Sequence, residues 1–234
     1  MLEQIIKDGF SEYGLPVSED IIGKYRQYCE LLLETNKVMN LTSIEGEDDT
    51  AKLHFLDCAA LLKYAGLAGK SLVDIGTGAG FPGLALKIAC PDIRLTLIDS
   101  LDKRIGFLKR TCEKLGLDDV ECIHARAEEI PPGFRESFDA ASSRAVARLN
   151  VLAELCLPYV REGGIFIAMK GPEVEEELEE AKPAIKMLGG RTESVNKYTV
   201  SGTDIIHSAI VIRKISTTPP GFPRKWAQIK KKPL

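Results

Sequence analysis

Three glycines spaced two residues apart stand where a short apolar run gives way to a helical pattern. The segment 71–83 reads SLVDIGTGAGFPG, and Gly76, Gly78 and Gly80 follow its apolar start. Glycine tolerates a positive φ and lets a ligand approach the backbone closely. Open α/β sheets bind ligands at the carboxyl ends of their strands. The segment therefore predicts a loop that cradles a nucleotide-type cofactor, and a tight turn without a ligand is the simpler alternative.

The spacing of these glycines separates two classes of cofactor. A dinucleotide loop has the pattern G-x-G-x-x-G, but Phe81 occupies the position of its third glycine. Asp74 stands before the first glycine, where a carboxylate would repel a pyrophosphate but would suit the cationic end of S-adenosylmethionine. The motif therefore favours S-adenosylmethionine, and a dehydrogenase is the weaker interpretation.

Two later segments are predicted to complete the cofactor site. Asp99 lies 19 residues beyond Gly80, and an acidic residue at about that distance commonly holds the ribose hydroxyls. The alternative role for Asp99 is to cap the helix that follows. Ala127 and Glu128 come after the strand-like run 120–124, where they could face the adenine ring or stand in a solvated turn.

The acceptor of the methyl group is expected where the fourth strand-like run ends, at Arg144. The chain has neither the N/D-P-P-Y/F/W loop that methylates exocyclic amines nor the Pro-Cys pair of covalent pyrimidine methylation. An arginine can hydrogen-bond a guanine oxygen or a carboxylate. Arg144 is therefore the first candidate for an acceptor contact, with a surface ion pair as the alternative. Lys170, at the end of the fifth run, is the second candidate.

The composition is that of an ordinary globular protein, with 44% hydrophobic and 28% charged residues. Its six cysteines form no CxxC motif and frame no histidine cluster, so we expect neither a metal site nor disulfides. Neither a signal peptide nor an apolar run of membrane length is evident. We therefore expect a cytoplasmic protein without a membrane partner, and a monomer by default.

Charge is distributed unevenly along the chain, whose net charge is −3. Six glutamates are concentrated in the segment 173–180, whereas residues 213–234 hold seven Lys or Arg and no acidic residue. A local basic segment on a mildly acidic protein is typical of a nucleic-acid contact. A solvated terminus without a partner is the alternative.

The apolar pattern predicts the elements that position these residues. Residues 1–65 read as helices, with Ser18 as an N-cap and a second amphipathic helix starting near Asp49. From residue 70, strand-like runs alternate with helical stretches, which indicates a mostly parallel sheet covered on both faces. The strand-like runs are 71–75, 94–98, 120–124, 138–142 and 164–169, and the helical stretches are 82–90, 102–115, 145–160 and 173–188.

Two final strand-like runs, 192–200 and 207–214, are predicted to form an antiparallel hairpin that closes a seven-stranded sheet. We accordingly divide the chain into a helical extension (1–66), a methyltransferase domain (67–215) and a basic tail (216–234).

In combination, these motifs resemble the glucose-inhibited division protein B family, also called ribosomal RNA small subunit methyltransferase G. The resemblance covers nearly the whole chain. The matching segments are Asn36–Lys37 with Asn40–Ile44, His54 with Asp57, Asp74–Gly83, Leu97–Ser100 with Lys103–Arg104, Ser143–Ala145 with Leu149–Asn150, Lys170–Gly171, and Pro223–Lys225 with Pro233–Leu234.

The resemblance implies a Rossmann-like α/β methyltransferase with an N-terminal helical extension. The implied reaction moves a methyl group from S-adenosylmethionine to ring nitrogen 7 of one guanine in 16S rRNA. That nitrogen carries a lone pair and no proton, so the reaction needs orientation rather than a general base. Arg144 or Lys170 would then bind the guanine oxygen. The implied cofactor contacts are Gly76, Phe81, Ala127, Glu128 and Arg144. The resemblance thereby changes the expected role of Arg144 from an acceptor contact towards a cofactor contact.

Contact with rRNA is expected at basic residues, namely Lys37, Lys103, Arg104, Arg224 and Lys225. The tail departs from the family pattern, since Trp226, Ala227 and Ile229 replace a Pro-Gly pair and a second proline. Its charge persists in the lysines at 230–232. A small-molecule methyltransferase, or a ribosome-binding protein with an inactive cofactor site, remains as an alternative function.

Overall fold

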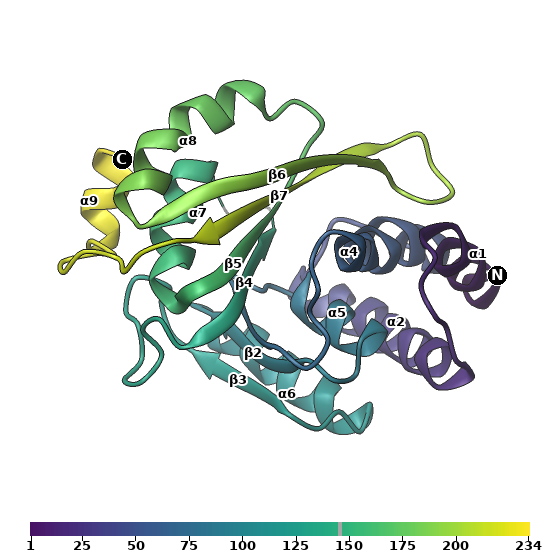
Figure 1. Cartoon of the computed structure of the whole chain (residues 1–234). Helices are drawn as coiled ribbons and strands as arrows, with labels where there is room; N and C mark the ends of the chain where they lie inside the picture. The colour runs from purple at the N-terminus through teal and green to yellow at the C-terminus, as the bar shows by residue number, and fades with distance from the viewer. Residues whose placement is uncertain (145–146) are drawn as a thin grey trace.

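A seven-stranded sheet forms the centre of the computed structural model, which describes residues 1–144 and 147–234 (Figure 1). The strand order is β3-β2-β1-β4-β5-β7-β6. The five strands β1 to β5 run parallel, and β7 is antiparallel to both β5 and β6. The predicted fold class, including the closing hairpin, is confirmed. The strands are β1 (Ser71–Ile75), β2 (Arg94–Asp99), β3 (Val120–His124), β4 (Phe138–Arg144), β5 (Val160–Lys170), β6 (Gly190–Thr199) and β7 (Ile206–Lys214).

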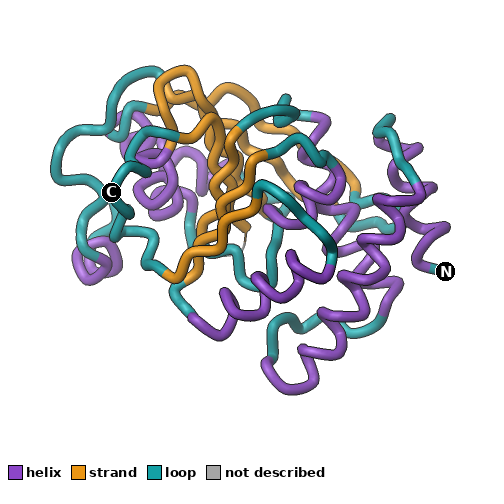
Figure 2. Tube along the Cα trace, turned by 90° about the horizontal axis from the view of Figure 1, so that it is seen from below, coloured by secondary structure: helices purple, strands orange, loops and turns teal. Residues whose placement is uncertain are grey.

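Helices cover both faces of this sheet (Figure 2). One face carries α5 and α6 together with the N-terminal helices, and the other face carries α7, α8 and α9. Each face has its own hydrophobic core, as expected for a parallel sheet. The helices are α1 (Leu2–Tyr13), α2 (Glu19–Met39), α3 (Glu47–Thr50), α4 (Asp57–Ala59), α5 (Gly83–Ala89), α6 (Asp102–Lys114), α7 (Leu149–Cys156), α8 (Glu175–Met187) and α9 (Trp226–Lys231).

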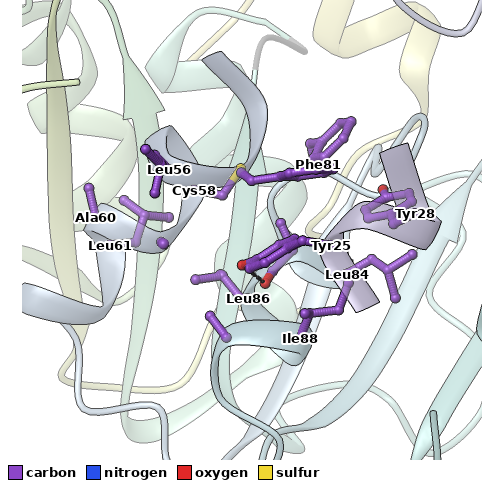
Figure 3. Close-up of a cluster of buried hydrophobic side chains, with 14 of the residues drawn as sticks. Tyr25, Tyr28, Leu56, Cys58, Ala60, Leu61, Phe81, Leu84, Leu86 and Ile88 are labelled. Atoms are coloured by element: carbon purple, nitrogen blue, oxygen red, sulfur yellow. Dashed lines mark hydrogen bonds between the residues drawn. The ribbon is translucent and has the colours of Figure 1, made fainter. Parts of the chain in front are cut away.

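The N-terminal helices share one continuous core with the sheet face that they cover (Figure 3). Tyr25 and Tyr28 of α2 are fully buried there. Their hydroxyl groups donate to the backbone oxygens of Ala85 and Ala79, at 2.8 and 2.5 Å. Buried tyrosines keep their polar tips hydrogen-bonded in this way. The extension is thereby fixed to the segment that follows β1.

The predicted start of α2 is confirmed, because the Ser18 hydroxyl accepts a hydrogen bond from the Ile21 amide at 3.2 Å. The second amphipathic helix starts at Glu47, close to the predicted position, but it is not a single regular helix. A π-helical segment, Ala51–Leu56, separates α3 from α4, and a 3₁₀ turn follows at Ala60–Lys63. Hydrophobic spacing alone does not predict such an insertion, which is rare and often marks a functional site.

Two predicted elements have boundaries that differ from the structure by more than two residues. β5 starts at Val160 rather than at residue 164, because the exposed residues 161–163, which read as a loop, belong to an irregular part of the strand where its register with β4 shifts. The predicted helix 145–160 consists in its described part of α7 and a 3₁₀ turn, Leu157–Tyr159. Its first two residues, Ala145 and Val146, lie outside the described residues.

The tail after β7 is folded against the domain rather than solvated. Ile229 of α9 is fully buried in the same core as α7. The Arg224 guanidinium donates to both carboxylate oxygens of Glu154, at 2.8 and 2.6 Å, and the Glu154 side chain is fully buried. The Arg135 guanidinium also holds the segment by donating to the backbone oxygen of Phe222 at 2.6 Å.

Removing one member of the Arg224–Glu154 pair should destabilise the fold. We expect Arg224→Ala to lower the free energy of unfolding by about 3 kcal/mol, because it leaves a buried carboxylate without its charged partner. Urea unfolding monitored by circular dichroism measures this difference. Lys230→Ala, which removes an exposed charge from the same segment, should stay within about 0.5 kcal/mol of the wild type. Equal stability of the two variants would contradict the prediction.

Candidate functional site

The glycine loop that follows β1 adopts the predicted backbone conformation. Gly76, Gly78 and Gly80 have φ values of 68°, 62° and 108°, all in the region that favours glycine. A Cβ added at Gly80 would lie 2.5 Å from the Tyr28 hydroxyl oxygen. A Cβ at Gly78 would meet no atom within 4 Å, so the backbone there faces open space. Gly80 therefore packs the loop against α2, and Gly78 leaves its outer side accessible.

Asp74, the predicted contact to the cationic end of the cofactor, lies near the carboxyl end of β1. Its side chain is fully buried and does not line the cavity that residues 1–144 and 147–234 form beside the loop. One carboxylate oxygen accepts from the Gly83 amide at 2.9 Å, and the other accepts from the Ser142 hydroxyl at 2.9 Å. Burial raises the pKa of Asp74 above its ordinary value. Asp74 thus ties β1 to the start of α5 and to β4, because the first amides of a helix lack intrahelical partners and attract a carboxylate.

A cavity of about 560 Å³, here called the glycine-loop cavity, opens at the carboxyl ends of β1, β2 and β4. Its volume lies within the range of small-molecule sites. The structure brings most of the predicted cofactor residues together around it. The predicted residues in its lining are Gly76, Gly78, Phe81, Asp99, Arg104, Ala127, Glu128 and Arg144, and among the others are Leu41, Thr42, His54, Leu155 and Trp226.

Asp99 lies at the floor of the glycine-loop cavity with its side chain only 3% exposed. Its carboxylate accepts from the Gly78 amide and from the Leu101 amide, both at 2.9 Å. Arg104 approaches the same carboxylate at 3.4 Å. Asp99 therefore braces both the glycine loop and the turn before α6. An ionised carboxylate has about four acceptor positions, so capacity remains for a ligand hydroxyl.

Arg144 stands at the end of β4 in contact with the π-helical segment. Its guanidinium donates to His54 Nδ1 at 2.9 Å and to the Leu53 backbone oxygen at 3.3 Å. The guanidinium also lies over the Phe81 ring, 4.8 Å from the centroid. In place of the surface ion pair that was the alternative interpretation, Arg144 belongs to a partly buried network, in which Asp57 approaches at 3.5 Å.

His54 is held in one tautomer by these contacts. Since a guanidinium cannot accept a hydrogen bond, the Nδ1 atom facing Arg144 must be unprotonated. The proton therefore sits on Nε2, which lies 2.8 Å from the Thr42 hydroxyl oxygen. Burial, together with the charge of Arg144, lowers the pKa of His54 to about 3. The ring stacks on Phe81 with centroids 4.2 Å apart.

A second cavity of about 470 Å³ adjoins the first, and we call it the His207 cavity. His54 and Arg144 line both cavities. Its lining combines apolar side chains with polar ones from the π-helical segment, α4, β4, β5 and β7. The lining residues are Ile44, Leu53, His54, Asp57, Arg144, Met169, Lys170, Gly171, Ile205 and His207.

Asp57 organises the polar side of the His207 cavity. One of its carboxylate oxygens accepts from Nδ1 of His207 and from the Tyr198 hydroxyl, both at 2.8 Å. The hydrogen bond to Asp57 raises the pKa of His207 above its ordinary value. Lys170 is also engaged, because its ammonium group donates to the Ala147 backbone oxygen at 2.6 Å and to Glu177 at 2.7 Å.

The residues predicted to bind RNA fall into two groups. Lys37, Lys103 and Lys225 are exposed. Arg104 and Arg224 each pair with a buried carboxylate, that of Asp99 and that of Glu154. The two arginines therefore have internal partners in addition to any RNA contact.

Sequence comparison places the chain among known proteins. A family model described as GidB, rRNA small subunit methyltransferase G, matches residues 21–206. The chain is 44% identical over 233 residues to the Ribosomal RNA small subunit methyltransferase G of Clostridium perfringens (strain 13 / Type A), covering 98% of each chain. The chain belongs to this family. It is also 46% identical over 237 residues to the protein of the same name from Alkaliphilus oremlandii (strain OhILAs), covering 100% of this chain and 99% of the relative.

Solved structures agree with this family's fold. The crystal structure of TrmN from Thermus thermophilus superposes with a TM-score of 0.55 at 20% identity, over 68% of this chain and 48% of that one. A putative transferase, PH0793 from Pyrococcus horikoshii, gives a TM-score of 0.57 at 15% identity, over 75% of this chain and 66% of that one. At such low identity these likenesses support the α/β fold alone.

His207 and Tyr198 carry no motif that the sequence could reveal, because they reach Asp57 from 150 and 141 residues away. Thr42 lies within the matching segment Asn40–Ile44, but its hydrogen bond to His54 was not predicted. Trp226 carries one signal in the sequence, since it replaces a residue of the family's tail pattern.

Two negative findings apply to the residues that the structure describes. Among residues 1–144 and 147–234, no group of three or more His, Cys, Asp or Glu side chains could hold a metal ion. No helix in those same ranges is both long and apolar enough to cross a membrane.

The lowered pKa of His54 predicts a specific loss of stability in acid. Below about pH 6.5 the unfolded chain protonates this histidine, whereas the folded chain keeps it neutral down to about pH 3. Stability should therefore fall with decreasing pH by up to about 1.4 kcal/mol per unit in this window. Between pH 7.5 and 5.0, the wild type should lose about 2 kcal/mol more than His54→Gln, which has no titrating ring.

Urea unfolding of both proteins at the two pH values checks this expectation. The His207 ionisation acts in the opposite direction, because a raised pKa adds stability at low pH and loses it as the pH rises through the folded value. Since His207 is present in both proteins, its effect cancels in the difference. An equal pH dependence of the two proteins would show that His54 is not held neutral.

Proposed function

We propose that this protein transfers a methyl group from S-adenosylmethionine to ring nitrogen 7 of one guanine in 16S rRNA. One observation carries the proposal: the chain matches rRNA small subunit methyltransferase G proteins along nearly its whole length. The geometry agrees with it, because two adjoining cavities share Arg144. A methyltransferase needs two ligands held side by side, one that carries the methyl group and one that accepts it. Two adjoining cavities meet that requirement.

The glycine-loop cavity has the features that S-adenosylmethionine requires. Gly76 and Gly78 line it, a Cβ at Gly78 would meet no atom within 4 Å, and Asp99 keeps one of its about four acceptor positions for a ribose hydroxyl. Ala127 and Glu128 would border the adenine ring, and Phe81 would lie towards the acceptor. When bound, S-adenosylmethionine supplies an electrophilic methyl group on a positively charged sulfur. Asp74 would act indirectly, by holding the loop in place.

The His207 cavity suits a guanine base. Apolar side chains such as Leu53 and Met169 can cover the base faces, and the cationic donors Arg144 and Lys170 are part of the same lining. The guanine oxygen lies beside nitrogen 7, so a donor on that oxygen positions the base without occupying the reactive lone pair. Arg144 is the residue best placed for this task, because it lines both cavities and has five N–H donors. Lys170 lines only the His207 cavity.

No proton needs to leave the acceptor, because ring nitrogen 7 of guanine carries a free lone pair. The chain's residues therefore act by orientation, which can supply several kcal/mol of a barrier. His54 remains neutral beside Arg144, so it adds no positive charge where a positively charged base forms. The stacking of His54 on Phe81 also keeps both rings fixed at the junction of the cavities.

We further propose that Lys37, Lys103, Lys225 and the lysines at 230–232 contact rRNA phosphates. Their exposure supports this assignment, and such contacts supply most of the affinity in nucleic-acid complexes. The substrate is 16S rRNA or the small ribosomal subunit.

The protein is proposed to act as a cytoplasmic monomer. All six cysteines are free thiols, which supports a reducing compartment. The division into an extension (1–66), a domain (67–215) and a tail (216–234) stands as a proposal too. Because the extension shares a core with the sheet, we expect it to fold only together with the domain.

The proposed activity is tested by methyl transfer to small ribosomal subunits that lack this modification. With tritiated S-adenosylmethionine, we expect label in 16S rRNA, and mass mapping should find a single 7-methylguanosine. Label in small metabolites instead would indicate a small-molecule methyltransferase. Binding of subunits without any methyl transfer would indicate an inactive cofactor site. Either result would reject the proposal.

Changing Arg144 should impair turnover more than cofactor binding. We expect Arg144→Lys to lower kcat by about tenfold or more, because a point charge cannot reproduce the planar donor fork and missing hydrogen bonds to charged groups cost about 1.5–3 kcal/mol. Steady-state kinetics with small subunits and calorimetry with S-adenosylhomocysteine separate the two effects. If Arg144→Ala keeps both the cofactor affinity and the turnover of the wild type, the assignment is wrong.

The lysines should determine the salt dependence of RNA binding. Replacing the three lysines at 230–232 with alanine should reduce the slope of log Kd against log salt by about one unit for each phosphate that is no longer bound. Filter binding of 16S rRNA over a salt series measures the slope. Lys186→Ala, an exposed lysine of α8, serves as the matched control and should leave the slope unchanged. An unchanged slope in the triple variant would remove the tail from the RNA surface.

A further inference from the structure

Trp226 is the only tryptophan of the chain and the first residue of α9. Its side chain lines the glycine-loop cavity and is 38% exposed. A large aromatic ring left partly exposed at a cavity is an unusual feature of a tail that is otherwise basic. The basic charge of the tail, which would account for RNA binding, does not account for a tryptophan at this position.

The position of Trp226 is fixed by the residues around it. Two positions before it, Arg224 is bound to the buried carboxylate of Glu154 on α7. Three positions after it, Ile229 is fully buried against the same helix layer. Leu155, the neighbour of Glu154, lines the glycine-loop cavity as well. The tail is thus anchored at the wall of the cavity, and the indole is held there before any ligand arrives.

The surroundings of α9 indicate which part of a ligand the indole would meet. Ala125 and Ala127 pack against the hydrophobic core that contains Ile229. Phe81 belongs instead to the core on the opposite face of the sheet. Trp226 therefore shares its side of the cavity with the segment assigned to the adenine ring. The His207 cavity, as formed by the described residues, does not include Trp226.

From these contacts we infer that Trp226 is part of the cofactor site and stacks on the adenine ring of S-adenosylmethionine. The inference rests on the proposed function, because it takes the glycine-loop cavity as the cofactor site. An indole face and a purine face attract each other strongly, and such stacking is worth about 1–3 kcal/mol for each base by alanine substitution. The basic tail would then bind RNA with its lysines and the cofactor with its tryptophan.

Intrinsic fluorescence tests this inference directly, since all tryptophan emission comes from one residue. Titration of the wild type with S-adenosylhomocysteine, an unreactive product, should change the emission with the same Kd that calorimetry gives. Trp226→Ala should bind S-adenosylhomocysteine about tenfold more weakly. Trp226→Phe, which keeps an aromatic face, should stay within about threefold of the wild type.

Gln228→Ala is the matched control, because it shortens an exposed side chain on the same helix and should leave the affinity unchanged. Thermal melting of each variant verifies that it is folded, and the wild-type titration requires no variant at all.

The possible outcomes separate this inference from the proposed function. If calorimetry detects no binding of S-adenosylhomocysteine to the wild type, both fail. If the wild type binds but its emission does not change, or if Trp226→Ala binds with wild-type affinity, only the role of Trp226 is rejected. An emission change that appears with a 16S rRNA fragment, and not with S-adenosylhomocysteine, would assign the indole to an RNA base and would overturn the inference.

Discussion

The carboxylate of Asp74 lies between three elements that have to meet at the carboxyl edge of the sheet. It accepts hydrogen bonds from the first amide of α5 and from the hydroxyl of Ser142 on β4. Gly83 allows this approach, because a Cβ there would lie 2.7 Å from the Asp74 Cβ. Burial of the carboxylate raises its pKa, so the hydrogen bonds must offset a desolvation cost. The position of the glycine loop, and with it the shape of the larger cavity, depends on this arrangement.

The N-terminal helices also hold the glycine loop in place and line both cavities. Gly80 is pressed against the Tyr28 hydroxyl, and the same hydroxyl donates to Ala79, so the loop is held on the side that faces α2. The π-helical segment then brings His54 over Phe81, where it meets Arg144. The extension therefore supplies one wall of each cavity, rather than merely protecting one face of the sheet.

The parts of the structure that follow from local sequence were predicted well. Alternating strand and helix patterns indicated the parallel sheet, and the three positive φ values follow from the absence of a Cβ at Gly76, Gly78 and Gly80. The direction of the Asp74 side chain could not be predicted, because a residue type indicates what a group can bind but not where it points.

Contacts between distant segments lay beyond the reach of local patterns. Asp57 and His207 are 150 residues apart, and no motif encodes their pairing. The packing of the tail against the domain could not be predicted either, because its basic composition does not show that Arg224 pairs with Glu154 or that Ile229 is buried.

The chain order of these elements has a consequence for biosynthesis. Domains generally fold as they emerge from the ribosome, N-terminal parts first. The sheet can form once β7 has emerged, but α9, with Trp226 and Ile229, follows it by more than ten residues. A nascent chain therefore has a formed glycine loop while one wall of its cavity is still missing, and the buried Glu154 lacks its arginine until that stage. The ligand site is thus complete only after the segment that follows β7 has been synthesised, so it can bind later than the sheet can form.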